Sequence, residues 1–263
     1  MFEIMSGTIP VLIHIPHDSI TIPKELIDGC NFALTMSDFD SAVIKMSDTG
    51  AYEVGSEYRT SCNVGTPYLI KSNVSRMIVD MERFDDEREE MNEIGHGVIY
   101  TTSADGVTNI YSDGLPAKII ERRKILYRLY SNTVASIVEQ LRNEYGYCLI
   151  IDLHSYDEHP AEYELHKDEF RPAICIGTNS KSDESLLSNK LNKYRWLIGF
   201  NEPFSGAYIP ERFIDDDCVN SVMIEMRKDY CNNNCNYNVI NNVLTDIIKI
   251  LLTPILRSSA YHG

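Results

Sequence analysis

The chain lacks the long apolar runs and the excess of positive charge that mark membrane-spanning and nucleic-acid-binding proteins. No apolar stretch of the 263-residue sequence approaches the roughly 18 residues of a transmembrane helix. Lys and Arg number 24 against 39 Asp and Glu, which gives a formal net charge of −15. This acidity argues against nucleic acid or an anionic membrane as a partner. An anionic ligand would therefore need a local group of arginines.

Signs of a disulfide framework, a secretory leader and a domain linker are also missing. The seven cysteines are an odd number without C-x-x-C spacing, which is typical of reduced thiols. The N-terminal Met-Phe-Glu-Ile-Met has neither the basic nor the apolar region of a signal peptide. No Pro-, Gly- or Ser-rich segment divides the chain. We therefore expect a cytoplasmic protein whose residues 1–263 form a single domain.

Short apolar runs alternate with segments of helical periodicity along the chain. The apolar runs predict strands at Val11–Ile15, Tyr68–Ile70, Met77–Val79, Cys148–Ile151, Ile174–Ile176 and Val222–Ile224. The periodic segments predict helices at Asp38–Ser47, Ala51–Tyr58, Ala117–Glu144, Asp183–Tyr194 and Val239–Leu252. This alternation predicts an α/β fold, a three-layer sandwich with a central mixed sheet.

Two of the predicted strands end in histidine. His17 follows the run at Val11–Ile15, and His154 follows the run at Cys148–Ile151. Open α/β sheets keep their chemistry at the carboxyl ends of strands, so both imidazoles could meet at one edge. Asp152 shares a strand face with His154 and could accept its N–H. A lone histidine of this kind is usually a packed core residue, but two with matching context favour a metal site.

Charged residues flank two further apolar runs. Glu225 and Arg227, two residues apart, would project to one face of an extended strand, as a proton acceptor and a carboxylate-binding group. An ordinary surface ion pair explains them equally well. Arg76 and Arg83 flank the run at Met77–Val79 and could bind a substrate carboxylate, although neighbouring acidic residues could also neutralise them.

Six ordered motifs along the chain resemble the N-formylglutamate amidohydrolase family, which is similar in fold to zinc carboxypeptidases and aspartoacylases. The motifs are Pro16-His17-Asp18-Ser19, Ser75-Arg76 through Asp80-Met-Glu-Arg83, Asp152-Leu-His154-Ser155, Gly177-Thr178, Asn201-Glu-Pro203-Phe204-Ser-Gly206 and Ile224-Glu225-Met-Arg227. The resemblance spans nearly the whole chain and implies a metal-dependent amidohydrolase.

The resemblance also implies roles for individual residues. His17 and His154 would bind one Zn²⁺ per chain, although mixed nitrogen and oxygen ligands also tolerate other divalent ions. Glu225 would be the general base. A carboxypeptidase-like ligand would require an acid at position 20, where this chain has Ile20, and the family's Asp-x-Asp segment instead favours Asp40, with Asp38 as the alternative. The predicted substrate-binding residues are Arg76, Arg83, Arg227, Asn201 and Ser155, with Ser205 as a further polar contact.

One departure from the family pattern concerns the substrate. Glu82 stands where the family commonly has asparagine, and a second carboxylate would repel a glutamate-like substrate unless the arginines compensate. The predicted reaction is hydrolysis of an N-formyl or N-acyl amino acid such as N-formyl-L-glutamate. The alternatives are a zinc carboxypeptidase-like peptidase or amidase with another substrate, and a non-catalytic binding protein of the same fold. The sequence does not predict an oligomeric state.

Overall fold

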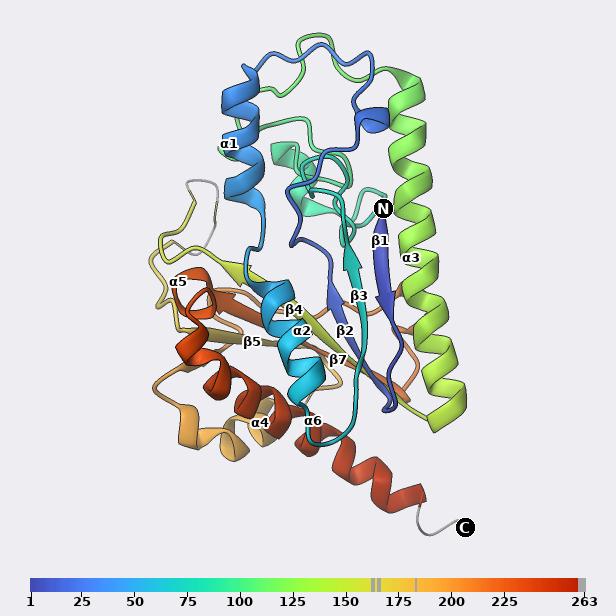
Figure 1. The fold of residues 1–263 in the computed structure, drawn as a ribbon, viewed down its shortest axis with the longest axis vertical. Coiled ribbons are helices and arrows are strands. Elements are labelled where there is room, and N and C mark those ends of the chain that lie inside the picture. The colour runs from blue at the N-terminus through green and yellow to red at the C-terminus, as the bar shows by residue number, and fades with distance from the viewer. Residues whose placement is uncertain (162–163, 165–166, 183, 260–263) are drawn as a thin grey trace.

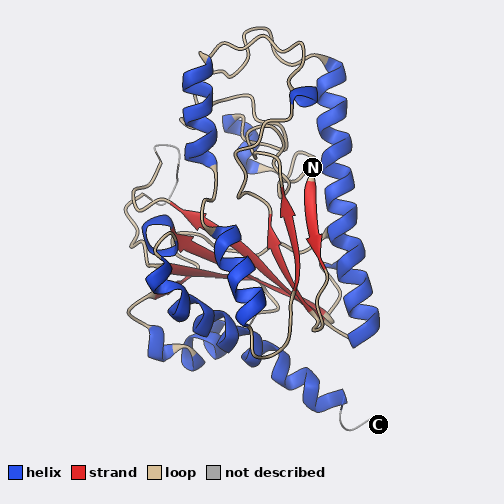
Figure 2. Cartoon of the chain, viewed as in Figure 1, coloured by secondary structure: helices blue, strands red, loops and turns tan. Residues whose placement is uncertain are grey.

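The computed structural model describes residues 1–161, 164, 167–182 and 184–259, and its centre is a seven-stranded mixed sheet (Figure 2). The strand order is β1-β3-β2-β4-β7-β5-β6. β1 is antiparallel to β3 and β5 is antiparallel to β7, while the other neighbouring strands are parallel. The strands are β1 (Phe2–Met5), β2 (Val11–Ile15), β3 (Tyr68–Ser72), β4 (Cys148–Tyr156), β5 (Ile174–Thr178), β6 (Ile198–Phe200) and β7 (Val219–Arg227).

Helices cover both faces of the sheet, which makes the three predicted layers (Figure 1). They are α1 (Met36–Met46), α2 (Ala51–Ser61), α3 (Ala117–Tyr145), α4 (Glu184–Lys190), α5 (Lys228–Cys231) and α6 (Tyr237–Ser259). One apolar cluster joins α2, α4 and α6 to the sheet, and a second joins α1 and α3 to its opposite face. Among the described residues, no helix has the length and apolar character needed to cross a membrane.

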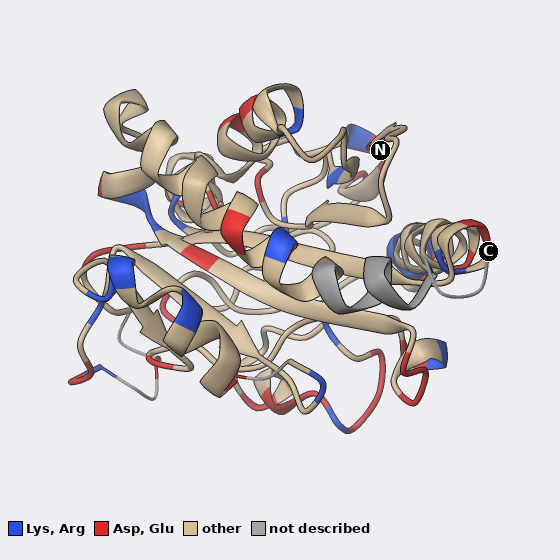
Figure 3. Ribbon diagram, turned by 90° about the horizontal axis from the view of Figure 1, so that it is seen from below, with Lys and Arg blue, Asp and Glu red and all other residues tan. Residues whose placement is uncertain are grey.

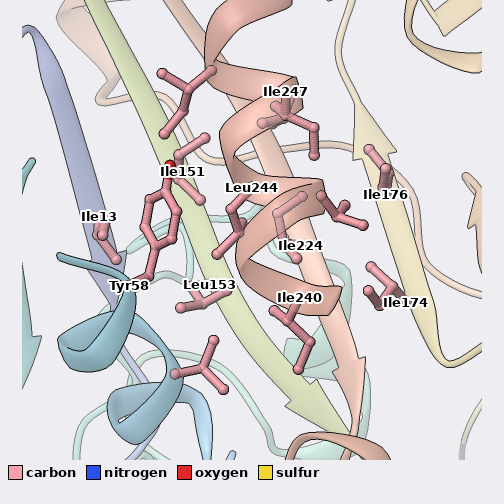
Figure 4. Packing of buried hydrophobic residues seen from close by; sticks show 14 of the residues in the cluster. Ile13, Tyr58, Ile151, Leu153, Ile174, Ile176, Ile224, Ile240, Leu244 and Ile247 are labelled. Atoms are coloured by element: carbon pink, nitrogen blue, oxygen red, sulfur yellow. The ribbon is translucent and has the colours of Figure 1, made fainter. Parts of the chain in front are cut away.

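Helix α6 packs against the middle of the sheet through an apolar stripe. Ile240 and Leu244 lie over Leu153 of β4 and Ile224 of β7 (Figure 4). These side chains are at most 1% exposed. Strands covered on both faces in this way are mostly apolar, which is why β2, apart from His14, and the first half of β4 read as apolar runs in the sequence. The rigid middle of the sheet fixes the position of the residues at its carboxyl edge.

Charged residues are distributed without a basic face in the view of Figure 3, where Lys and Arg segments alternate with Asp and Glu segments. Several of the arginines lie in ion pairs, such as Arg88 with Asp86 and Arg142 with Asp216. This arrangement agrees with the acidic composition of the chain.

The predicted α/β sandwich with a mixed sheet is confirmed, as are five of the six predicted strands. The prediction of a strand at Met77–Val79 is wrong. This segment is a buried turn, in which the Ser75 carbonyl accepts hydrogen bonds from the backbone N–H groups of Ile78 and Val79. An apolar run reports burial, and a buried turn satisfies the same pattern as a short buried strand. The edge strands β1 and β6 were not predicted because they are short and partly exposed.

The five predicted helices are present with shifted ends. The segment predicted as one helix at Asp183–Tyr194 contains α4 and a separate 3-10 turn at Asn192–Tyr194. Asp183 lies outside the described residues. Helix α3 begins after Pro116 and ends at Gly146, whose φ of +75° is a left-handed conformation that favours glycine.

Candidate active site

A cleft of about 1250 Å³ opens where β2, β4 and β7 end. Its lining includes His17, Asp48, Glu82, His154 and Glu225. The sheet register explains this grouping, because His154 of β4 lies directly opposite Glu225 of β7. The cleft is therefore at the carboxyl edge of the parallel strands, where the sequence predicted the chemistry.

The two histidines meet in the cleft, as predicted. Their Nδ1 atoms lie 3.3 Å apart, and both side chains are almost completely buried. His17 comes from the segment after β2, and His154 comes from the end of β4. Two imidazole nitrogens this close together suit a shared metal ion better than two independent packing positions.

Asp48 contributes the third donor atom at this point. Its Oδ2 atom is 2.9 Å from Nδ1 of His154 and 3.6 Å from Nδ1 of His17. Ligand atoms about 2.0–2.2 Å from a tetrahedral zinc ion are separated from one another by about 3.3–3.5 Å. The separations among these three atoms are close to that value, so the chain holds a group of residues that fits a divalent metal.

Outer carboxylates lie beside the far nitrogen of both imidazoles. Nε2–H of His17 donates to Oδ1 of Asp80 at 2.7 Å, and Nε2 of His154 lies 3.1 Å from Oδ1 of Asp152. A carboxylate at Nε2 leaves the Nδ1 lone pair directed toward the metal position. Burial alone would lower the pKa of His154, but Asp152 and Glu82 raise this pKa well above its usual value. A metal ion would take the place of that proton.

Arg76 binds two of the carboxylates that surround the histidines, Asp80 and Asp48. Its guanidinium donates two hydrogen bonds to Oδ2 of Asp80, at 3.2 and 2.9 Å, and a longer one of 3.5 Å to Asp48. Burial alone would raise the pKa of Asp80, but His17 and Arg76 hold it well below its usual range. Asp48 and Asp80 are therefore kept as carboxylates.

Glu82 offers a second oxygen donor near the histidines. His17, Glu82 and His154 have ligand atoms close enough to hold a metal. However, Oε2 of Glu82 lies 3.2 Å from Nε2 of His154 and 3.9 Å from Nδ1 of His17. A Glu82 site would use Nε2 of His154, whereas Asp48 lies 2.9 and 3.6 Å from the two Nδ1 atoms that are themselves 3.3 Å apart, so Asp48 fits the third position better.

The structure does not bring Asp40, the predicted third ligand, into this group. Asp40 is exposed on α1, and it does not line the cleft. Asp38 is exposed too, and its backbone N–H donates to the capping hydroxyl of Thr35. The reason is the helical period of α1, which buries Phe39 and turns the residues on either side toward solvent. The acidic residue that reaches the histidines, Asp48, follows the end of α1.

Glu225 has the environment of a proton acceptor. It lines the cleft beside His154, and its buried Oε2 atom has no hydrogen-bond partner in the part of the chain that the structure describes. Burial raises the pKa of Glu225 to about 7, although His154 opposes this shift. A carboxyl group with such a pKa can accept a proton and return it near neutral pH.

The predicted substrate-binding residues occupy different places. Arg76, Arg83 and Ser155 line the cleft, as does Ser205. Arg83 lies 3.4 Å from Asp80, and its buried Nε has no hydrogen-bond partner among the described residues. The hydroxyl of Ser155 donates to the Thr49 carbonyl at 3.0 Å. Of these, Arg83 has the greatest remaining capacity to donate to a ligand.

Arg227 and Asn201 are not part of the cleft lining. The Arg227 guanidinium donates to Asp229 at 2.7 Å and to the Arg171 carbonyl at 3.0 Å. The Asn201 side chain accepts a hydrogen bond from the Thr178 backbone at 2.9 Å and donates to Glu184 at 2.8 Å. Both residues hold neighbouring segments together in this structure.

Comparison with known proteins identifies relatives along most of the chain. Residues 9–231 match the model of a family described as N-formylglutamate amidohydrolase. An N-formylglutamate deformylase of Pseudomonas putida is 27% identical over 238 residues, which cover 84% of this chain and 80% of the relative. A protein of the same name from Pseudomonas aeruginosa is 26% identical over 188 residues, which cover 68% of this chain and 64% of the relative.

Solved structures show the same fold. The crystal structure of an N-formylglutamate amidohydrolase from Ralstonia eutropha JMP134 has a TM-score of 0.76 at 18% identity, covering 98% of this chain and 99% of that one. A gene product of Agrobacterium tumefaciens has a TM-score of 0.71 at 19% identity, covering 97% and 94%. The family match extends across β2, β4 and β7, which carry the cleft residues, and the chain therefore belongs to the N-formylglutamate amidohydrolase family.

Proposed function

We propose that this chain is a metal-dependent amidohydrolase that cleaves N-formyl-L-glutamate to formate and L-glutamate. The family match and the two Pseudomonas relatives named N-formylglutamate deformylase support the substrate. The observation that carries the chemistry is the position of Glu225, a buried carboxyl group whose pKa is about 7, beside the His17, Asp48 and His154 group. The family and its N-formyl substrate were predicted from sequence, and the comparisons confirm the family.

His17, Asp48 and His154 would hold the metal, for which Zn²⁺ is the best candidate. Two nitrogen donors and one carboxylate oxygen form the donor set of many catalytic zinc sites. A bound zinc ion supplies Lewis acidity, which polarises an amide carbonyl and lowers the pKa of water. The same donors tolerate manganese, iron or cobalt, so the choice of metal rests on affinity and availability.

Glu225 would handle the proton during hydrolysis. Its carboxylate accepts a proton from the attacking water, and the resulting carboxylic acid donates it to the departing amine nitrogen. A pKa near 7 makes both transfers accessible at neutral pH. Because Glu225 lies opposite His154 in the sheet register, the proton acceptor and the metal-binding group remain in fixed relative positions.

Arg83 would bind a substrate carboxylate. The positive charge of Arg76, which also lines the cleft, would add to the attraction of that carboxylate. The side chain of Arg83 is 25% exposed and lies in the cleft lining. Ser155 and Ser205 provide polar groups on the cleft wall. We place Arg227 and Asn201 in the supporting wall, because their side chains bind other segments of the chain.

The second candidate function keeps the chemistry and changes the substrate to another N-acyl amino acid. Glu82 favours it, since its carboxyl group lies in the same cleft and its Oε2 finds no hydrogen-bond partner among the residues described. Burial and the neighbouring Asp152 raise the pKa of Glu82. The family match and the relatives named N-formylglutamate deformylase keep N-formyl-L-glutamate as the first choice. From the sequence we also predict that the chain forms a single catalytic domain and that the protein is located in the cytoplasm.

Formate release from N-formyl-L-glutamate tests the proposal. We expect chelator-sensitive release by the wild type and a decrease of kcat of about 10²–10⁴-fold in Glu225→Gln, the usual contribution of a general base. The control is Glu144→Gln, which removes an exposed carboxylate at the end of α3. Metal content should be the same in all three proteins.

The pH dependence of the wild type provides a further check. An acid must be ionised to accept a proton, so kcat/KM should fall as the pH decreases through the pKa of Glu225. Its metal-free pKa of about 7 sets the upper limit for this midpoint, because a bound cation favours the carboxylate. Formate release that is unchanged in Glu225→Gln would contradict the proposed role, and release only from other N-acyl amino acids would select the second candidate.

A further inference from the structure

A fully buried histidine lies beneath the floor of the cleft. His14 of β2 is 0% exposed and is the register partner of Asp152 on β4. Its Nδ1–H donates to Oδ1 of Asp152 at 2.8 Å. This is the only side-chain hydrogen bond that the described residues provide to His14, and its Nε2 atom is buried without a partner. Burying a polar side chain with only one hydrogen bond destabilises the folded state, so the hydrogen bond to Asp152 points to a function for His14.

That hydrogen bond fixes a carboxylate that itself faces a proposed metal ligand. Oδ1 of Asp152, which binds His14, is also 3.1 Å from Nε2 of His154. The other oxygen, Oδ2, accepts a hydrogen bond of 3.3 Å from the backbone N–H of Tyr208. Asp152 is thus held from two sides by His14 and Tyr208, and it also faces His154.

The ring of His14 is itself held in one orientation. It stacks on Tyr208 with ring centroids 4.7 Å apart and an angle of 23° between the planes. The ring of Tyr130 packs nearby, with centroids 5.8 Å apart. Aromatic contacts of this kind restrict the rotation of the imidazole, so its Nδ1–H points steadily at Asp152.

We propose that His14 is a positioning residue for the metal site, acting through Asp152 to orient His154. With Asp152 fixed, its Oδ1 atom keeps a constant position 3.1 Å from Nε2 of His154, at ion-pair distance, while Nδ1 of His154 faces His17 and Asp48. The inference rests on the proposed function, because it assumes that His154 binds a metal. It adds a third histidine to the site, one that does not line the cleft.

Zinc affinity of the metal-free protein tests the role without using activity. The dissociation constant would be measured by competition with a chromophoric chelator for the wild type, His14→Leu and His14→Asn. Loss of an outer hydrogen-bond partner typically weakens metal binding about 10–100-fold, and we expect this for His14→Leu. The side-chain amide introduced by His14→Asn would place an N–H near the position of Nδ1, so this variant should recover most of the affinity.

The matched control is Tyr130→Phe. It removes a buried hydroxyl that has no hydrogen-bond partner among the described residues, on a ring that packs near His14 without a hydrogen bond to it. Its zinc affinity should equal that of the wild type. Circular dichroism of the metal-free variants would exclude loss of fold as the cause of weaker binding.

Three results would overturn the positioning role. They are unchanged zinc affinity in His14→Leu, equal losses in the leucine and asparagine variants, and two zinc ions per chain with one lost in His14→Leu. The last result would identify His14, Glu82 and Asp152 as a second metal site, since their ligand atoms also lie close together. If the affinity pattern is as expected but no N-formyl-L-glutamate is hydrolysed, the proposed function fails and the positioning role stands.

Discussion

Replacing Asp48 with alanine tests the ligand set most directly. The Asp48 carboxylate lies 2.9 Å from His154 and 3.6 Å from His17 at their Nδ1 atoms, so its removal leaves two imidazoles at the metal position. Loss of an outer-sphere partner weakens metal binding about 10–100-fold. Loss of a ligand must weaken it further, so we expect a decrease in zinc affinity of more than about 100-fold, which is a loss of more than about 2.7 kcal/mol.

The assay is zinc titration of the metal-free protein against a competing chelator. Asp40→Ala is the matched control, since Asp40 is an exposed aspartate on α1 and was the ligand predicted from sequence. Its affinity should stay within error of the wild type. A large loss in Asp40→Ala with none in Asp48→Ala would refute the assignment made from the structure. A loss only in Glu82→Ala would transfer the third position to Glu82, the other carboxylate near the histidines.

Two further predictions concern the substrate and the core. Glu82→Asn removes a carboxyl group from the cleft and installs the residue expected in the family, so KM for N-formyl-L-glutamate should fall by about tenfold, corresponding to ~1.4 kcal/mol of relieved repulsion. Steady-state kinetics would check this, and an increased KM would show instead that Glu82 binds the substrate. Leu244→Ala leaves a cavity between α6 and the sheet and should lower the free energy of unfolding by about 2–5 kcal/mol in urea denaturation. A change below about 1 kcal/mol would mean that this core collapses around the cavity.

The parts of the site that lie on strands could be predicted from the sequence. His17, His154 and Glu225 each follow or end an apolar run, and such runs report buried strands. Parallel neighbours in a sheet end at the same edge, so residues at the ends of β2, β4 and β7 meet whatever the intervening loops do. A local sequence pattern that marks the end of a buried strand can therefore identify residues that meet at this edge of the sheet.

The parts of the site on connecting segments could not be predicted in this way. Asp48 lies between α1 and α2, and only the packing of these helices brings it to the histidines. Its local signal is the short polar segment Ser47-Asp48-Thr49-Gly50, in which Gly50 has a φ of +96°. Such a segment indicates a turn, but it does not say what the turn faces.

Spacing on a strand face was also an incomplete guide. Glu225 and Arg227 are two residues apart on β7, as expected for side chains on the same face, yet Glu225 lines the cleft and Arg227 does not. Asp229 and the Arg171 carbonyl bind the guanidinium beyond the cleft wall. For a long side chain at the end of a strand, the available partners decide its direction, and these partners become known only from the tertiary structure.

The acidic composition that argues against anionic partners for the whole chain also affects the cleft, where carboxyl groups outnumber guanidinium groups around the histidines. In the described part of the chain, five carboxyl groups surround the histidines, against the two guanidinium groups of Arg76 and Arg83. These carboxyl groups belong to Asp48, Asp80, Glu82, Asp152 and Glu225. Contacts with the histidines, and then with Arg76, hold the pKa of Asp48 and of Asp80 low, while burial raises the pKa of Glu82 and of Glu225. Protons and a divalent cation are thus alternative means of neutralising the same excess charge. Metal binding would lower the pKa of both raised carboxyl groups, which ties the protonation state of the proposed base to occupancy of the metal site.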